Sequence, residues 1–172
     1  VATAPIKALI ITVVIAILLL AINMRAPIIG FGAVAKLVQQ DLRLTTKTIG
    51  LIGTIPVMAF ASSSFVAPML SRRIGLENTM ILATSLLAIG IFVRVAHPQL
   101  GFLLAGTVLL SLAISLGNVL IPAVIKKYTP NQIGLVMGSY SMFLSVFAGF
   151  ASGIAMWLVS LSSWQFALGV WG

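Results

Sequence analysis

The segment from Ile22 to Gly30 contains the residues best suited to bind a small solute. Arg25 is the only charged side chain in residues 8–35. At ~1.5 Å per residue, a continuous helix through this segment would hold Arg25 well inside a bilayer. A guanidinium there is costly unless it faces a polar cavity or a bound anion, which predicts Arg25 as the cation of an anion site. The alternative is a span that ends at Met24 and lets Arg25 reach the interface.

Two asparagines precede prolines at the same spacing. Pro27 lies four residues after Asn23, and Pro122 lies four residues after Asn118. In a helix each proline removes the donor to the asparagine carbonyl, so both prolines are predicted helix kinks. Interrupted helices at matching places in two inverted repeats mark the binding site of many transporters. We therefore predict Asn23 and Asn118 as polar substrate contacts; for Asn118, a hydrogen bond between helices is an equal alternative.

Three further features have weaker signals. Tyr140 stands mid-helix between two serines, where it either packs in the core or joins the substrate contacts. Arg94 lies near the end of its apolar run and is predicted to anchor that end at the membrane interface. Small residues recur at spacings of three and four, which allows close helix packing. This predicts a tight contact within the bundle, and an interface between two copies of the chain is the alternative. The small residues are Gly134, Gly138, Ser141, Ser145, Gly149 and Ser152/Gly153.

Composition determines the class of protein. Of 172 residues, 60% are hydrophobic and 7% are charged, against about 25% charged residues in ordinary globular domains. The sequence is therefore that of an all-α integral membrane protein, and its partner is the lipid bilayer. The net charge of +8 comes mostly from residues at the ends of apolar runs, where basic side chains anchor helices, so we exclude nucleic acid as a partner.

The apolar runs predict one transmembrane domain over residues 1–172, with five spans and the start of a sixth. Val1 stands in place of an initiator methionine and the sequence ends inside an apolar stretch, so we expect a longer protein. The predicted spans cover residues 8–38, 48–70, 79–95, 99–125 and 132–159, and the sixth begins at 164–172.

The sequence does not show the groups of residues that catalysis needs. Asp41 and Glu77 are the two carboxylates, both in predicted connectors, and His97 is the one histidine. These do not make an acid/base pair or a metal cluster, and there is no cysteine to add a thiolate. We predict that the chain is not an enzyme and has no cofactor or metal.

Several stretches resemble the cyanate permease group of the major facilitator superfamily, which includes cyanate and nitroimidazole carriers. The resemblance rests on the segments around Asn23 to Pro27, Ala67 to Gly75, Arg94 to Gln99, Pro122 to Gly138, and Trp164 to Trp171. It covers nearly the whole chain in order. It implies the N-terminal six-helix half of a twelve-helix protein, whose two halves rock about a central site between them.

The resemblance also implies an orientation. The N-terminus would lie in the cytoplasm of a multi-pass plasma-membrane protein, and Arg72, Arg73 and Gly75 would form its cytoplasmic gating loop. The alternative is that the two arginines anchor lipid phosphates. In the superfamily's general loop signature, Gly-x-x-x-Asp-Arg-x-Gly, Pro68 replaces the first glycine and Arg72 replaces the aspartate. The charge relay associated with that aspartate is therefore not expected here.

These observations lead to one predicted function and its rival. The chain is expected to be part of a secondary active transporter that moves a small anion or polar solute, such as cyanate, by alternating access. Its missing partner would be the C-terminal half of the same protein. The rival is a truncated, transport-inactive membrane fragment or interaction subunit. A channel subunit is a third class, but the sequence shows no ring-forming filter motif.

Overall fold

The structure, a computed structural model, describes residues 4–171, with side chains from Ile10 onward. Val1 and Gly172, on which two of the expectations above rest, lie outside that range. The described residues form six helices and no strand: α1 (Ala4–Asp41), α2 (Thr46–Ile74), α3 (Leu76–Ala96), α4 (Leu100–Tyr128), α5 (Ile133–Leu161) and α6 (Trp164–Gly169). The all-helical fold class predicted from the sequence is confirmed.

Five of the described helices, α1 to α5, are long and apolar enough to cross a membrane. These helices have 21 to 38 residues, which correspond to roughly 30 to 57 Å at ~1.5 Å per residue. Prolines do not end them, because α1 continues through Pro27 and α4 continues through Pro122. Whether these prolines bend their helices stays a prediction.

The turn between α2 and α3 is shorter than the sequence suggested. We expected a basic turn over residues 71–78, but α2 includes Arg72 and Arg73 and ends at Ile74. Gly75 alone separates the helices, with φ of 91° and ψ of 156°. Only glycine adopts this backbone conformation readily, which explains how a single residue can reverse the chain.

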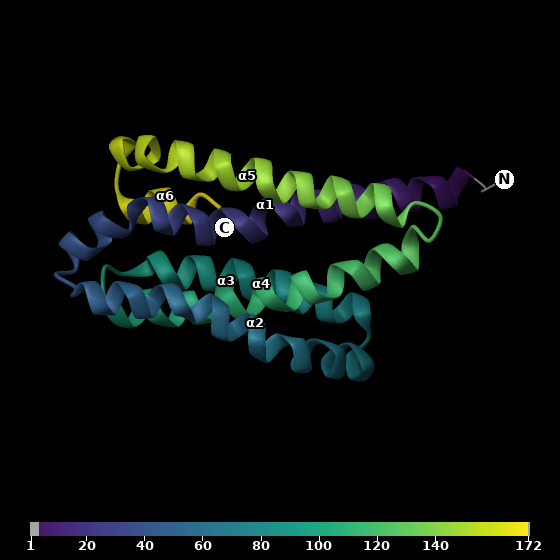
Figure 1. Ribbon diagram of the computed structural model, residues 1–172, viewed down its shortest axis with the longest axis horizontal. Helices are drawn as coiled ribbons and strands as arrows, with labels where there is room; N and C mark the ends of the chain where they lie inside the picture. The colour runs from purple at the N-terminus through teal and green to yellow at the C-terminus, as the bar shows by residue number, and fades with distance from the viewer. Residues whose placement is uncertain (1–3, 172) are drawn as a thin grey trace.

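The bundle divides into two groups of three helices. Helix α1 packs along α5, with α6 beside both, while α2 and α3 both pack along α4. Figure 1 shows the first group in the upper half of the view and the second in the lower half. When α1, α2 and α3 are matched in order with α4, α5 and α6, the contact of α1 with α5 corresponds to the contact of α4 with α2. Two inverted repeats predict this correspondence.

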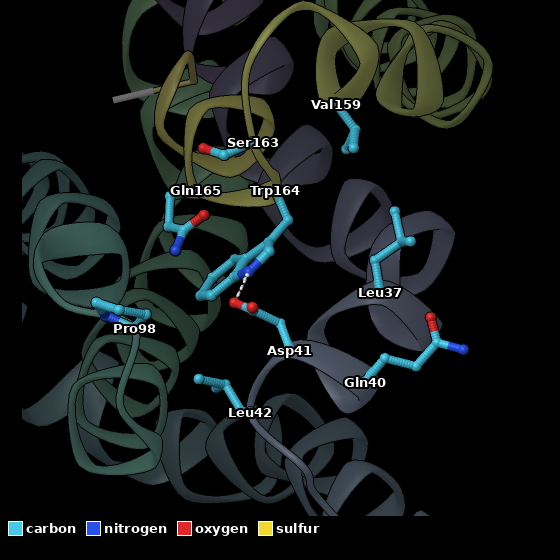
Figure 2. Close-up of a pocket in the computed structure, with 9 residues that line it drawn as sticks. All are labelled: Leu37, Gln40, Asp41, Leu42, Pro98, Val159, Ser163, Trp164 and Gln165. Atoms are coloured by element: carbon cyan, nitrogen blue, oxygen red, sulfur yellow. Dashed lines mark hydrogen bonds between the residues drawn. The ribbon is translucent and has the colours of Figure 1, made fainter.

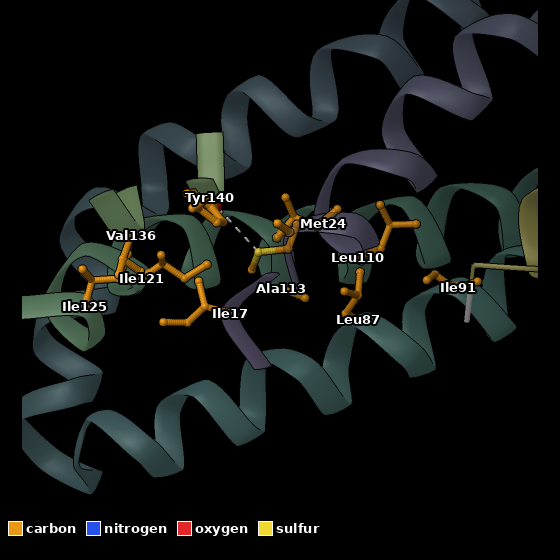
Figure 3. Close-up of a cluster of buried hydrophobic side chains, with 12 residues drawn as sticks. Ile17, Met24, Leu87, Ile91, Leu110, Ala113, Ile121, Ile125, Val136 and Tyr140 are labelled. Atoms are coloured by element: carbon orange, nitrogen blue, oxygen red, sulfur yellow. Dashed lines mark hydrogen bonds between the residues drawn. The ribbon is translucent and has the colours of Figure 1, made fainter. Parts of the chain in front are cut away.

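The main core lies where the two groups meet (Figure 3). It joins buried side chains of α1, α3, α4 and α5, with Met24 and Tyr140 near its centre. Glycines allow α4 to approach its neighbours closely. A Cβ at Gly106 would come within 2.4 Å of the Arg94 Cα, and one at Gly117 within 1.7 Å of the Met24 Cε. These contacts make α4 the most buried of the described spans.

Candidate functional site

The two asparagine–proline segments lie side by side at the centre of the bundle. Met24, next to Asn23 on α1, packs directly on Gly117, next to Asn118 on α4. Tyr140 reaches this crossing from α5, donates a hydrogen bond to Asn118 Oδ1 at 2.7 Å, and has its hydroxyl 4.0 Å from Met24 Sδ. The hydrogen bond between helices that was one alternative for Asn118 is therefore present, and the Tyr140 side chain is 5% exposed.

Arg25 lies beside this crossing with its side chain exposed. The helix does not end at Met24 but continues for 16 residues beyond Arg25, roughly 24 Å. Arg25 therefore does not lie at a helix end, from which it would reach the interface most directly. Arg25 directly follows Met24 on α1, and Met24 Sδ lies 4.0 Å from the Tyr140 hydroxyl. Arg25, Tyr140 and Asn118 thus form one polar neighbourhood on α1, α5 and α4.

Neither carboxylate of the described chain neutralises Arg25. Glu77, on α3, forms an ion pair with Lys127 and accepts a hydrogen bond from the Tyr128 hydroxyl at 2.7 Å. Asp41, at the end of α1, accepts a hydrogen bond from the Trp164 indole at 2.7 Å. Arg25 is therefore free to pair with an anion from outside the described chain.

Asn23 faces a different direction from Arg25. It lines a cavity of about 150 Å³ between α1 and α3, together with Leu20, Thr84, Ile91 and Trp171. Two positions along a helix are about 200° apart, which explains why the neighbours Asn23 and Arg25 do not converge. The structure brings three of the four predicted substrate contacts together and places the fourth in an adjoining cavity.

Arg94 is buried, and the expectation that it anchors a helix end at the interface is wrong. Its side chain is 2% exposed and points into the bundle. One guanidinium nitrogen, Nη1, donates to the Pro27 carbonyl oxygen at 3.0 Å, and the guanidinium carbon lies 4.5 Å from the Phe31 ring centroid. Helical periodicity could have found it, because Arg94 follows the buried residues Leu87 and Ile91 at spacings of seven and three.

The small residues of α5 do not make the tight contact within the bundle that was expected. Gly134, Gly138, Gly149 and Gly153 have no other atom near the position of an added Cβ, and Ser141 and Ser145 are exposed as well. The buried face of α5 is instead formed by other residues of the helix, which packs along α1. They include Val136, Tyr140, Ala151, Ala155 and Leu158.

Two surface cavities lie away from the candidate site. Arg72 and Arg73, at the end of α2, line an open depression of about 520 Å³ with Ser64, Phe65 and Pro68. A larger one of about 780 Å³ lies at the other end of the bundle (Figure 2). There the Trp164 indole points at Asp41 between the end of α1 and the turn before α6. None of the four predicted substrate contacts lines either of these cavities.

Comparison with known proteins identifies the family. A profile of the Major Facilitator Superfamily matches residues 9–172. The chain is 32% identical over 158 residues to the uncharacterized transporter YycB of Bacillus subtilis. It is 32% identical over 159 residues to the 2-nitroimidazole transporter of Escherichia coli, and 25% identical over 156 residues to the cyanate transport protein CynX of the same organism.

These alignments also show how much of each relative the chain represents. They cover 91%, 92% and 90% of this chain but 39%, 40% and 41% of the three relatives. The chain thus spans about two fifths of the length of the relatives that it matches. The resemblance to cyanate and nitroimidazole carriers that its motifs indicated is confirmed: the chain belongs to the Major Facilitator Superfamily.

Proposed function

We propose that the chain forms the N-terminal part of a secondary active transporter that carries a small anion or polar solute by alternating access. The observation that carries this proposal is the exposed Arg25 in the middle of a membrane-length helix, without a carboxylate partner in the described chain. A guanidinium in that position favours an anionic ligand. Cyanate fits as a small univalent anion, and one relative is named for its transport.

Each predicted contact has a role in this proposal. Arg25 pairs with the anion, and the Asn118–Tyr140 pair offers amide and hydroxyl groups beside it. Asn23 is a further polar contact, reached through its own cavity when the helices rearrange. Pro27 and Pro122 weaken the helical hydrogen bonding next to these residues, which permits local adjustment. Arg72, Arg73 and Gly75 serve the cytoplasmic gate, with the N-terminus in the cytoplasm and the protein in the plasma membrane.

The remaining partner is a second half of the transporter. The exposed small residues on α5 support this proposal, because an uncovered face of that kind allows another helix to approach closely. The aligned residues make up 39% and 40% of two matched relatives, so more than half of each relative lies outside the alignment and leaves room for such a half. The rival proposal, a transport-inactive fragment or interaction subunit, has the same open face but predicts no uptake under any condition.

Uptake of labelled cyanate into proteoliposomes tests the proposal, using the complete reading frame that contains this chain. We expect Arg25→Ala to abolish saturable uptake and Arg25→Lys to retain part of it, because lysine keeps the charge without the planar geometry. Lys36→Ala is the matched control, since Lys36 is an exposed cation on the same helix, and it should leave uptake unchanged. Normal uptake by Arg25→Ala at equal protein amounts would contradict the role of Arg25.

A further inference from the structure

Arg94 connects the two helix groups of the bundle. It belongs to α3, in the group with α2 and α4, and its hydrogen bond to the Pro27 carbonyl oxygen crosses to α1, in the group with α5 and α6. We call the boundary between the two helix groups the seam. A second hydrogen bond, from Tyr140 on α5 to Asn118 on α4, also crosses it. The contact of Met24 with Gly117 lies beside this second hydrogen bond, because the Tyr140 hydroxyl is 4.0 Å from Met24 Sδ.

The surroundings of Arg94 do not balance its charge. The side chain is 2% exposed, and its Nε has no hydrogen-bond partner among the described residues. Asp41 and Glu77 are both engaged elsewhere, so the cation is held by one carbonyl oxygen and the face of Phe31. A buried charge in this condition costs stability, and an apolar residue would fill the same space at lower cost. Stability alone therefore does not explain an arginine here.

The position of its acceptor suggests what Arg94 does. Pro27 lies two residues beyond Arg25 on α1, at the point where the helix has lost a backbone donor. A side chain from α3 that holds this point limits how far α1 can shift or rotate. The Arg94 backbone is itself fixed, because Gly106 of α4 lies directly against it. The restraint on α1 therefore comes from the α3–α4 pair rather than from a mobile surface group.

We propose that Arg94 is a positioning residue: it holds α1 at Pro27 against α3 and so sets where Arg25 presents its charge to an anion. The effect on transport rests on the proposed function, in which Arg25 binds the anion. The effect on helix position does not, because it depends only on the contacts of Arg94 with Pro27 and Phe31. The two parts therefore call for separate measurements.

The first experiment measures the distance between α1 and α3. Spin labels are placed at Lys36→Cys on α1 and His97→Cys after α3, both exposed, in the complete reading frame. This chain contributes no native cysteine to the background. We expect Arg94→Met to broaden the distance distribution and Arg94→Lys to keep it close to the parent. Phe31→Leu, which removes the ring but keeps the charge, should broaden it less. Arg25→Met is the matched control and should not broaden it.

The second experiment measures how uptake depends on cyanate concentration in the same variants. We expect Arg94→Met to raise KM about tenfold with a maximal rate within about twofold of the parent, because a displaced Arg25 binds the anion less well. Arg94→Lys should recover most of the affinity. A residue that only stabilises the fold would instead lower the amount of active protein, and hence the maximal rate, at unchanged KM.

Different results overturn different claims. An unchanged distance distribution in Arg94→Met overturns the positioning of α1, and a lowered maximal rate with unchanged KM overturns its effect on anion binding. If Arg25→Met transports normally, the proposed anion site fails instead, and the spin-label distances alone then decide whether Arg94 positions α1. If Arg94→Met does not fold, Phe31→Leu and Arg94→Lys decide the same question: Phe31→Leu should broaden the distribution, Arg94→Lys should keep it close to the parent, and an unchanged distribution in Phe31→Leu overturns the proposal.

Discussion

Arg25 and Arg94 both lie within membrane-length helices, and their surroundings are opposite. Arg25 is exposed, and the carboxylates of the described chain are engaged elsewhere. Arg94 is enclosed by a carbonyl oxygen, an aromatic face and the backbone of α4. The difference shows that a charge inside a membrane protein can serve either a ligand or the scaffold. Its exposure and its contacts, rather than its residue type, distinguish these roles.

Chemical labelling gives the largest expected difference between the two positions. We expect Arg25→Cys to react with a charged, water-soluble thiol reagent at least about 100-fold faster than Arg94→Cys, because an enclosed thiol is shielded from both water and reagent. Reaction rates measured on the complete reading frame in liposomes check this. Lys36→Cys, exposed on α1, supplies the upper reference. Similar labelling rates at positions 25 and 94 would contradict the difference in exposure between Arg25 and Arg94.

Helix packing around Arg94 gives the next largest effect. Gly106→Ala would place a methyl group 2.4 Å from the Arg94 Cα, and backbone atoms cannot move aside as a flexible side chain can. We expect a loss of about 2–3 kcal/mol in the free energy of unfolding, in the range of overpacked cores. Gly101→Ala, on the same helix as Gly106, meets open space and should be neutral or stabilising by up to about 1 kcal/mol. Unfolding in detergent distinguishes the two variants.

The hydrogen bond beside Arg25 gives a smaller effect. Tyr140→Phe removes the donor to Asn118 Oδ1 and keeps the ring in the core. We expect a loss of about 1 kcal/mol in the free energy of unfolding, typical of one neutral hydrogen bond. If the hydroxyl also contacts the anion, the KM for cyanate rises in the same variant. A Tyr140→Phe protein that is as stable as the parent would show that the bond contributes nothing to the seam between the helix groups.

The smallest effect is expected at the exposed ion pair of α3 with α4. Lys127→Met breaks the ion pair with Glu77. Both side chains of this pair are about half exposed. Exposed pairs contribute little after solvent screening, so we expect a change below about 1 kcal/mol that decreases further at high salt. Thermal unfolding at two salt concentrations checks it. A change larger than that of Tyr140→Phe would show that this end of the bundle is a more important restraint than the seam.

Much of this fold could be predicted from the sequence, because apolar runs of membrane length leave the chain few alternatives to helices. The span predicted over residues 8–38 already continued through Pro27, whereas the proximity of Asn118 to Tyr140 needed the structure. Arg94 was misassigned because its place near the end of an apolar run suggested an anchor, whereas its side chain points inward. The small residues of α5 were misassigned because spacing alone does not say which side of a helix is covered.

The separation of Asn23 from Arg25 has a similar cause. Their nearness in sequence suggested one site. However, a helix turns about 100° per residue, so two residues that are two positions apart lie on nearly opposite faces of the helix. Periodicity could have shown this before the structure, whereas the partner of each face depends on how α3, α4 and α5 pack around α1. Packing of that kind is not encoded in the local pattern of any one helix.

Gly75 makes the joint between α2 and α3 short, so the end of α2 and the start of α3 stay close together. A connector of several residues absorbs movement, whereas one residue leaves almost no slack between the two helices. A displacement of α2 at Arg72 or Arg73 must therefore pass into the start of α3. Arg94 lies at the far end of α3, roughly 27 Å away at ~1.5 Å per residue. Helix α3 can thus act as a rod that connects the loop at one face of the membrane with the restraint on α1 near the other.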